Sequence, residues 1–200
     1  MTRVYLVRHG QTDWNVEGRL QGSSNTQLNE TGRAQARRAA QSLRSVIRPG
    51  VVVASSPLDR ASDTAHIVAE QWGIEIHTDQ RLAERDYGPW EGLSSDEREE
   101  YSPLQHKEWR EGREPEYAGY ENHASVGARM VEAIEEWAVK APDDLVIVTH
   151  GSAGRMAVLH LLGLEVAGRR VGNLENAAWS RLVQPEGGGW SLDRLNIGAE

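Results

Sequence analysis

The chain has 200 residues, of which 38% are hydrophobic and 26% charged, and its formal net charge is −8. This composition excludes a disordered chain and fits one soluble globular domain with a sizeable core. There is no cysteine, which excludes disulfides, thiolate zinc sites, iron–sulfur clusters and a cysteine nucleophile. The negative charge argues against nucleic acid as a partner, although a local group of cations can still bind a phosphate.

The sequence also argues against a membrane partner. No apolar stretch approaches the roughly 20 residues that a transmembrane helix needs. The N-terminus carries a single early arginine and enters an apolar run at once, which is unlike a signal peptide. We therefore expect a cytoplasmic location.

The predicted elements alternate between strands and helices along the chain. Apolar runs predict strands at residues 4–7, 50–55, 74–77 and 145–148, and helical spacing predicts helices at 31–46, 56–72, 126–139 and 155–162. Thr31 is the expected N-cap of the first helix, and Ser56 with Pro57 the expected start of the second. Residues 177–183 and 190–195 flank a glycine-rich turn and predict a hairpin. This alternation predicts an α/β fold, a three-layer α/β/α sandwich with a mostly parallel central sheet.

Two segments do not fit regular elements. The loop at 10–29 is too long for a simple connector, which marks it as a candidate functional loop. Residues 81–119 are polar and include an acidic run at 96–100, typical of a solvated helical face. We expect one domain over residues 1–200, with 81–122 as a lid-like excursion over the site.

Two histidines each end an apolar run. His9 follows the strand at 4–7, His150 follows the strand at 145–148, and a glycine comes after each histidine. Uninterrupted apolar runs are typical of strands buried on both faces of a parallel sheet. Ligands of such sheets bind in the crevice beyond the carboxyl ends of the strands. Two imidazoles brought there from opposite ends of the chain predict a site.

The residues beside these histidines suit phosphoryl chemistry. Arg8 precedes His9, and its planar guanidinium matches the oxygens of a phosphate. Arg60 follows the strand at 50–55 and is expected to reach the same crevice, although a solvated surface arginine is an equal alternative. A neutral histidine can itself act as nucleophile, and neighbouring cations favour the neutral form.

Such a reaction also requires a proton donor for the leaving oxygen. Glu84 is the candidate, in a segment that two glycines and Trp90 mark as ordered. Asp86 and Glu91 lie close by in the sequence, and spacing does not choose among the three carboxylates.

Six blocks of sequence together resemble the histidine phosphatase superfamily. They are RHGQTDWN (8–15), GRLQG (18–22), LNETGRAQA (28–36), SSPLDRASDTA (55–65), LAERDYGPWEG (82–92) and VTHGS (148–152). The blocks follow the order of the family and span nearly the whole chain. The family includes cofactor-dependent phosphoglycerate mutases and many phosphomonoesterases, and the resemblance implies a phosphoglycerate mutase-like fold.

The resemblance implies a role for each matching residue. His9 would become the phosphohistidine, while Arg8 and Arg60 would hold the phosphoryl oxygens. His150 would stabilise the transition state, and Glu84 would act as general acid and then as base. Further contacts to phosphate or substrate would come from Asn15, Gln21, Gly22, Ser23, Gly151 and Ser152. This chemistry would need no metal and no organic cofactor.

Hydrolysis is favoured over mutase chemistry. Mutases of this type carry a longer insertion with basic residues after the acid, whereas the region here is short and acidic, although Lys107, Arg110 and Arg113 could contact an anion. The segments 172–179 and 190–193 are more loosely similar to actinobacterial glucosyl-3-phosphoglycerate phosphatases, which implies a small sugar or glycerate phosphate as substrate. Phosphoglycerate mutase-type transfer and a phospho-ligand-binding protein with little turnover are the alternatives. Family members often pair, so a homodimer is possible.

Overall fold

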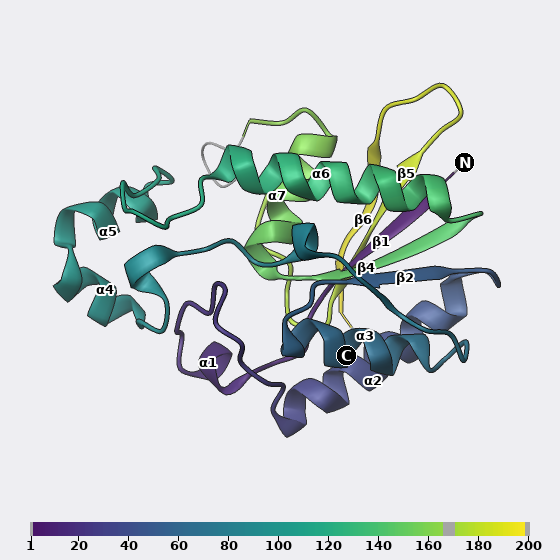
Figure 1. The fold of residues 1–200 in the computed structure, drawn as a ribbon, viewed down its shortest axis with the longest axis horizontal. Coiled ribbons are helices and arrows are strands. Elements are labelled where there is room, and N and C mark those ends of the chain that lie inside the picture. The colour runs from purple at the N-terminus through teal and green to yellow at the C-terminus, as the bar shows by residue number, and fades with distance from the viewer. Residues whose placement is uncertain (1, 166–170, 199–200) are drawn as a thin grey trace.

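A computed structural model describes residues 2–165 and 171–198 of the chain, and a mixed sheet forms its centre (Figure 1). The strands lie in the order β3-β2-β4-β1-β5-β6. The first four of these run parallel to one another, whereas β5 and β6 are antiparallel additions. The strands are β1 (Thr2–Arg8), β2 (Val52–Ser55), β3 (His77–Thr78), β4 (Asp144–Thr149), β5 (Trp179–Gln184) and β6 (Ser191–Ile197).

Helices cover both faces of the sheet, which confirms the predicted α/β class (Figure 1). Helices α2 and α3 pack on one face, and α6 and α7 on the other. The described helices are α1 (Asp13–Val16), α2 (Glu30–Val46), α3 (Asp59–Ala69), α4 (Ser95–Tyr101), α5 (Pro103–Arg110), α6 (His123–Lys140) and α7 (Gly151–Leu161), with short 3₁₀ turns η1 (Gln80–Leu82) and η2 (Gly88–Trp90). None of the helices in residues 2–165 and 171–198 is long and apolar enough to span a membrane.

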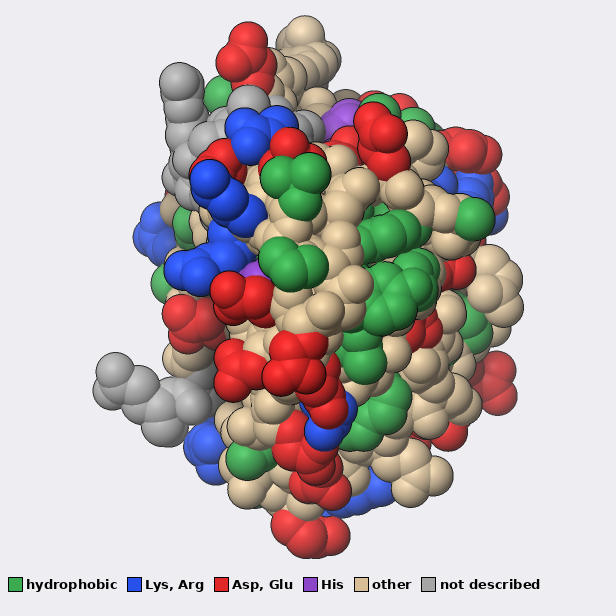
Figure 2. All heavy atoms as spheres, turned by 90° about the vertical axis from the view of Figure 1, so that its left-hand side faces the viewer, with side chains coloured by type: hydrophobic (Ala, Val, Ile, Leu, Met, Phe, Trp, Pro, Cys, Tyr) green, Lys and Arg blue, Asp and Glu red, His purple; other side chains and the backbone are tan. Residues whose placement is uncertain are grey.

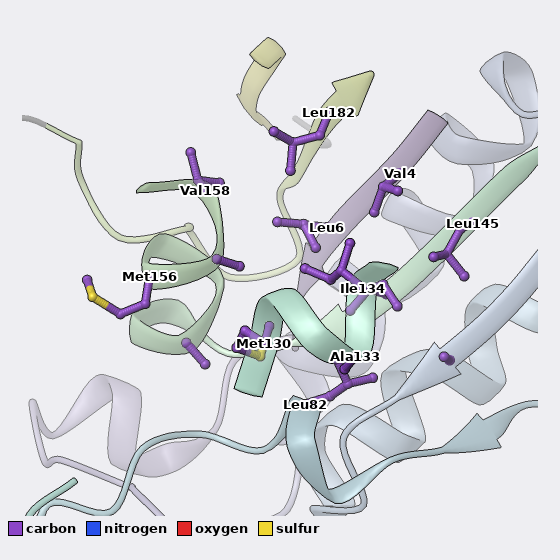
Figure 3. Packing of buried hydrophobic residues seen from close by; sticks show 14 of the residues in the cluster. Val4, Leu6, Leu82, Met130, Ala133, Ile134, Leu145, Met156, Val158 and Leu182 are labelled. Atoms are coloured by element: carbon purple, nitrogen blue, oxygen red, sulfur yellow. The ribbon is translucent and has the colours of Figure 1, made fainter. Parts of the chain in front are cut away.

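The apolar run of β1 divides between two cores because successive side chains of a strand point to opposite faces. Val4 and Leu6 join the core beneath α6 and α7, where Figure 3 shows them close to Ile134 and Leu182. Tyr5 and Val7 join the core formed with α2 and α3. All four side chains are fully buried, so a run without polar residues is what this central position requires.

Several predicted boundaries are wrong. The strand expected at 74–77 is the two-residue β3, and α6 begins at His123 and not at Val126. The N-cap of α2 is Asn29 and not Thr31, because the Asn29 side-chain oxygen accepts a hydrogen bond from the backbone N–H of Gly32, which has no partner within the helix. Helix α3 begins at Asp59 and not at Ser56, whose N–H still donates to Val148 of the neighbouring strand. Helix α7 begins at Gly151, immediately after His150, and not at Arg155. The last difference places a helix N-terminus beside the second histidine.

Residues 81–122 leave the sheet and carry α4 and α5 to one end of the molecule (Figure 1). Asp96, Glu99 and Glu100 are exposed on α4, as the acidic run predicted. Figure 2 views this end and shows many Asp and Glu side chains, with Lys and Arg side chains gathered along one edge. Beneath this surface, Trp90 is fully buried within a group of aromatic rings. The excursion therefore has a small core of its own.

Candidate active site

The two histidines lie side by side because their strands are neighbours in the sheet. Strands β1 and β4 are parallel, with Arg8 paired to Thr149, so the next residue of each chain segment leaves at the same edge. The ring centroids of His9 and His150 are 5.2 Å apart, and the rings are tilted by 58°. Both side chains are buried, at 2% and 0% exposure. The expected meeting of the two imidazoles is thus present in the structure.

The hydrogen bonding of His9 determines which of its nitrogens can react. Nδ1 lies 2.7 Å from the carbonyl oxygen of Gly10, which can only accept, so Nδ1 carries the proton. Burial, followed by the charges of Arg8 and Arg60, lowers the pKa of His9 well below its usual range. The imidazole is therefore neutral at pH 7, with the lone pair on Nε2. This is the protonation state of a nucleophile.

His150 is held from the other side by a buried serine. Its Nε2 lies 2.8 Å from the hydroxyl oxygen of Ser56. Its Nδ1 is buried and has no hydrogen-bond partner within the described part of the chain. Burial, followed by the charges of Arg60, His9 and Arg8, lowers the pKa of His150 well below its usual range. His150 is therefore also neutral at pH 7.

Two buried guanidinium groups face the histidines. The Arg8 side chain donates to the carbonyl oxygen of Leu174, at 2.8 Å. Arg60 is fully buried and donates to the carbonyl oxygens of Gly22 and Ser24, at 2.8 and 2.7 Å. Burial lowers the pKa of Arg8, and it lowers the pKa of Arg60 to about 10, so both remain charged at pH 7. Among described residues, the Nε atoms of Arg8 and Arg60 have no partner, which leaves donors for a bound anion.

The fold distinguishes among the three candidate carboxylates. Glu84 accepts hydrogen bonds from the backbone N–H groups of Ser152 and Ala153, at 3.0 and 2.9 Å, so it is fixed at the N-terminus of α7. Its side chain lines the same cavity as His9. Asp86 and Glu91 do not line this cavity. Asp86 accepts from a backbone N–H two residues on, and Glu91 holds the loop at 23–24.

The cavity at this edge of the sheet has a volume of about 110 Å³, enough for a phosphoryl group and a few waters. It brings together most of the predicted site residues, namely Arg8, His9, Asn15, Gln21, Gly22, Arg60, Glu84, Gly151 and Ser152. His150 is buried next to it, against His9. Ser23 does not line the cavity, because its N–H and hydroxyl donate to Glu91. The backbone N–H of Ser152 is likewise engaged, by Glu84.

Asn15 and Asn176 connect the long loop to His9. The side-chain oxygen of Asn15 accepts from the backbone N–H of Thr12 and from the amide of Asn176. The Asn176 amide also donates to the backbone carbonyl oxygen of His9, at 3.1 Å. With its oxygen engaged in this way, the Asn15 amide has its nitrogen available to donate to a ligand.

Sequence reasoning missed several residues that line the cavity or hold its members. Arg19, Leu20, Tyr87 and Asn173 contribute to its wall, and Ser56 and Asn176 bind the histidines. Arg19, Leu20, Ser56 and Tyr87 lie within the blocks that carry the family resemblance, whereas Asn173 and Asn176 lie in the segment 172–179, whose similarity is looser. In residues 2–165 and 171–198, no group of three or more His, Cys, Asp or Glu side chains is arranged to hold a metal ion.

Comparison with known proteins agrees with this geometry. The family model of the histidine phosphatase superfamily (branch 1) matches residues 4–198. Glucosyl-3-phosphoglycerate phosphatase of Mycobacterium tuberculosis is 35% identical over 99% of this chain and 96% of its own length. A probable phosphoglycerate mutase, GpmB of Serratia proteamaculans, is 36% identical over 91% of this chain and 85% of its own.

A solved structure extends the similarity to three dimensions. The structure of a mycobacterial glucosyl-3-phosphoglycerate phosphatase in complex with VO₃ superposes with a TM-score of 0.89 at 35% identity, covering 98% of this chain and 99% of that one. The family match, the fold and the paired histidines agree. The chain belongs to branch 1 of the histidine phosphatase superfamily.

Proposed function

We propose that the protein is a phosphomonoesterase that hydrolyses a small phosphorylated sugar or glycerate through a phosphohistidine on His9. The observation that carries this proposal is the contact of His9 Nδ1 with the carbonyl oxygen of Gly10, at 2.7 Å, since it leaves the lone pair of Nε2 to react beside the two arginines. The relatives named as glucosyl-3-phosphoglycerate phosphatases support the substrate class.

The first step forms a bond from Nε2 of His9 to phosphorus and breaks the ester P–O bond. Arg8 and Arg60 would hold the equatorial oxygens, where charge accumulates in the transition state. Nδ1–H of His150 would donate to a phosphoryl oxygen. Protonated Glu84 would give its proton to the leaving oxygen, so that the substrate departs as an alcohol.

The second step releases the phosphoryl group to water. Glu84, now a carboxylate, would take a proton from a water molecule whose oxygen attacks phosphorus. The P–N bond breaks, inorganic phosphate leaves, and both His9 and Glu84 return to their starting protonation states. No metal or organic cofactor takes part in this scheme.

The alternative is mutase chemistry, in which the phosphoryl group on His9 passes to a second hydroxyl of the substrate instead of to water. The 36% identical relative named as a probable phosphoglycerate mutase favours it. A mutase assay run beside the hydrolysis assay distinguishes them, because hydrolysis releases inorganic phosphate and mutase chemistry does not.

We also propose that residues 81–122 form a lid over the site within a single domain. The cytoplasmic location and the homodimer stay predictions.

Replacing the nucleophile tests the proposal directly. His9→Ala should reduce hydrolysis of an aryl phosphate on the order of 10³-fold or more, since it removes the atom that attacks phosphorus. A phosphoenzyme that is trapped by acid quench in the wild type should be absent from the variant. The matched control is His66→Ala on α3, an exposed histidine. Wild-type turnover by His9→Ala would refute the assignment.

The acid is tested by the leaving group. The glutamine of Glu84→Gln cannot act as an acid. The variant should therefore hydrolyse esters of alkyl alcohols about 10²- to 10⁴-fold more slowly than the wild type, and the rate for esters with good leaving groups should fall far less. Asp86→Asn, two residues away, should slow neither. Equal suppression of both ester classes by Glu84→Gln would place the proton donor elsewhere.

A further inference from the structure

Glu84 lies outside the strands and helices of the fold. It follows the 3₁₀ turn η1 and Ala83, whereas His9 and His150 directly follow strands of the sheet. The backbone groups of a strand are paired by its neighbours, but those of an irregular segment need other partners. The position of the Glu84 carboxyl group therefore depends on what holds the backbone at 81–83.

Arg129 of α6 holds two of these backbone carbonyls. Its Nη1 donates to the carbonyl oxygen of Arg81, at 2.7 Å, and to that of Ala83, at 2.8 Å. On the other edge of the guanidinium, Nε and Nη2 donate to the two carboxylate oxygens of Glu121, at 2.7 and 2.8 Å. This two-point contact with a carboxylate fixes the plane of the guanidinium. Arg129 therefore presents Nη1 to the segment before Glu84 in one orientation.

The carbonyl between these two has a partner as well. The buried hydroxyl of Thr149 donates to the carbonyl oxygen of Leu82, at 2.8 Å. Thr149 is the last residue of β4 and immediately precedes His150, so this bond ties the acid-bearing segment to the strand end that carries the histidine. The Leu82 side chain is fully buried where η1 packs against α6, and Figure 3 shows it there with Ala133. Three successive carbonyls before Glu84 are thus held by two side chains.

Glu121 extends this network to the other side of Glu84. Its backbone N–H donates to the carbonyl oxygen of Asp86, at 2.9 Å. Because Arg129 holds the Glu121 carboxylate, one ion pair binds the backbone both before and after the acid. The backbone around Glu84 is therefore fixed by side chains, although no regular element contains it.

Neither Arg129 nor Thr149 lines the phosphoryl cavity, so an effect of either on the chemistry must pass through the residues that it holds. Proton transfer requires an acid within about 2.6–3.2 Å of the leaving oxygen, and a displacement of about 1 Å can cost on the order of 10²-fold in rate. We propose that Arg129 and Thr149 are positioning residues that place the Glu84 carboxyl group for proton transfer to the leaving group. This role rests on the proposed function, because it requires Glu84 to be the acid.

The leaving group separates positioning of the acid from a general structural role. The ratio kcat/KM reports the steps up to formation of the phosphoenzyme, in which Glu84 is the acid. Arg129→Gln should lower kcat/KM for an alkyl ester, glycerol 3-phosphate, by about tenfold or more, and for p-nitrophenyl phosphate by less than about threefold. Arg129→Lys keeps the charge but has no planar fork to bind two carbonyls and a carboxylate together, so it should show the same difference between the esters.

Variants of Thr149 test the same role from β4. Thr149→Val keeps the shape of the side chain but loses the hydroxyl, so it should lower kcat/KM for the alkyl ester more than for the aryl ester. Thr149→Ser retains the donor and should restore the wild-type ratio between the two esters. The control is Lys140→Gln at the far end of α6, whose ion pair with Glu136 is half-exposed and whose loss should change neither ester.

A double variant decides whether Arg129 acts through Glu84. In the Glu84→Gln background, Arg129→Gln should change kcat/KM for either ester by less than about twofold, because the group that it positions no longer donates a proton. An equal loss for both esters in Arg129→Gln would overturn the positioning role. So would a loss of alkyl ester hydrolysis that is the same in the presence and absence of Glu84.

The outcomes also separate this role from the proposed function. If Arg129→Gln fails to fold, Thr149→Val is measured in the same two backgrounds. If Glu84→Gln itself lowers kcat/KM equally for both esters, the acid assigned in the proposed function is wrong and the positioning role fails with it. A difference between the esters in Glu84→Gln, without one in Arg129→Gln, overturns the positioning role alone.

Discussion

At the scale of single residues, the site depends on buried polar atoms that the described chain does not satisfy. Nε of Arg8, Nε of Arg60 and Nδ1 of His150 have no partner in this part of the chain. Buried polar groups are normally hydrogen-bonded, and leaving one unpaired destabilises the fold by about 1–3 kcal/mol. Two such atoms on residues that line one cavity, and a third on the histidine beside it, suit a ligand rich in acceptor oxygens. A phosphoryl group meets that requirement.

Ser56 sets the proton position of His150. The backbone N–H of Leu58 donates to the Ser56 hydroxyl oxygen, at 3.3 Å, which leaves the hydroxyl proton for Nε2 of His150. With Nε2 accepting, the imidazole proton is on Nδ1, the unpartnered atom beside His9. Ser56 is thus a positioning residue, which acts through His150.

Ser56→Ala should reduce kcat about tenfold, corresponding to one lost hydrogen bond of about 1.4 kcal/mol, with little change in KM. The control is Ser55→Ala, since the adjacent buried hydroxyl bonds a backbone carbonyl oxygen instead of the histidine. Steady-state kinetics of both variants check this expectation. An equal loss of kcat in both variants would show that Ser56 contributes only to packing.

At the scale of elements, the excursion at 81–122 is held together by aromatic and cationic side chains. The Trp90 ring meets those of Trp109, Tyr117 and Tyr120 edge to face, at centroid distances of 5.9, 5.4 and 6.4 Å. Arg85 lies over the Tyr120 ring at 4.5 Å. Such contacts add to the burial of the rings themselves. The segment that follows Glu84 is therefore ordered by its own packing.

Trp90→Ala should remove about 3–5 kcal/mol of packing from this segment, because it empties the centre of the aromatic group. Amide hydrogen exchange over α4 and α5 should accelerate, whereas exchange in β1 and β4 should not. The control is Trp137→Ala on α6, a tryptophan that stacks on His77 outside this group. Protection that stays at the wild-type level in α4 and α5 would contradict this account.

At the scale of the whole molecule, the two ends of the parallel strands differ in electrostatics. The carboxyl ends gather the arginines and histidines of the site, whereas the amino end of β4 begins with the fully buried Asp144. Arg3 donates to both oxygens of Asp144, at 2.6 and 2.5 Å, and the backbone N–H of Arg48 donates at 2.8 Å. Burial alone would raise the pKa of Asp144, but these hydrogen bonds outweigh it and lower the pKa below its usual value. A buried carboxylate with its cations thus lies at the end of the sheet opposite the site.

Asp144→Asn should lower the free energy of unfolding at pH 7 by about 3 kcal/mol, since the buried side chain loses its charge-assisted hydrogen bonds with Arg3 and Arg48. Because the folded pKa is depressed, the contribution of Asp144 is present above its unfolded pKa near 4 and is lost as pH falls through the folded value. The difference between wild type and variant should therefore shrink below about pH 4.

Urea unfolding over a series of pH values measures this difference in the free energy of unfolding between wild type and Asp144→Asn. Asp143→Asn is the control, a neighbouring carboxylate that is 48% exposed and pairs with Arg48, and it should change stability by less than about 1 kcal/mol. A difference between wild type and Asp144→Asn that persists unchanged at pH 2 would show that charge is not its cause.

The elements that the sequence predicted well are those whose pattern has a single physical cause. Val4–Val7 and Leu145–Val148 are apolar without interruption because both faces of β1 and β4 are covered, and the structure has them fully buried. The errors at Thr31 and Ser56 arose where a competing hydrogen bond decides the boundary. The Asn29 side chain accepts from the N–H of Gly32, and the N–H of Ser56 donates to the carbonyl oxygen of Val148. A local pattern does not contain such partners.

By itself, the sequence determined the fold class, the family resemblance and the pair His9 and His150, since residues at the ends of parallel strands need no further information to share an edge. The tertiary structure decided which carboxylate accompanies them. Glu84, Asp86 and Glu91 are equivalent by spacing, and the distinction comes from the N-terminus of α7, 68 residues away from Glu84, whose N–H groups hold that side chain alone at the cavity. It also decided that Arg113 lines the cavity between the excursion and α7, while Lys107 and Arg110 line a different hollow, because this depends on how the excursion packs against the rest of the chain.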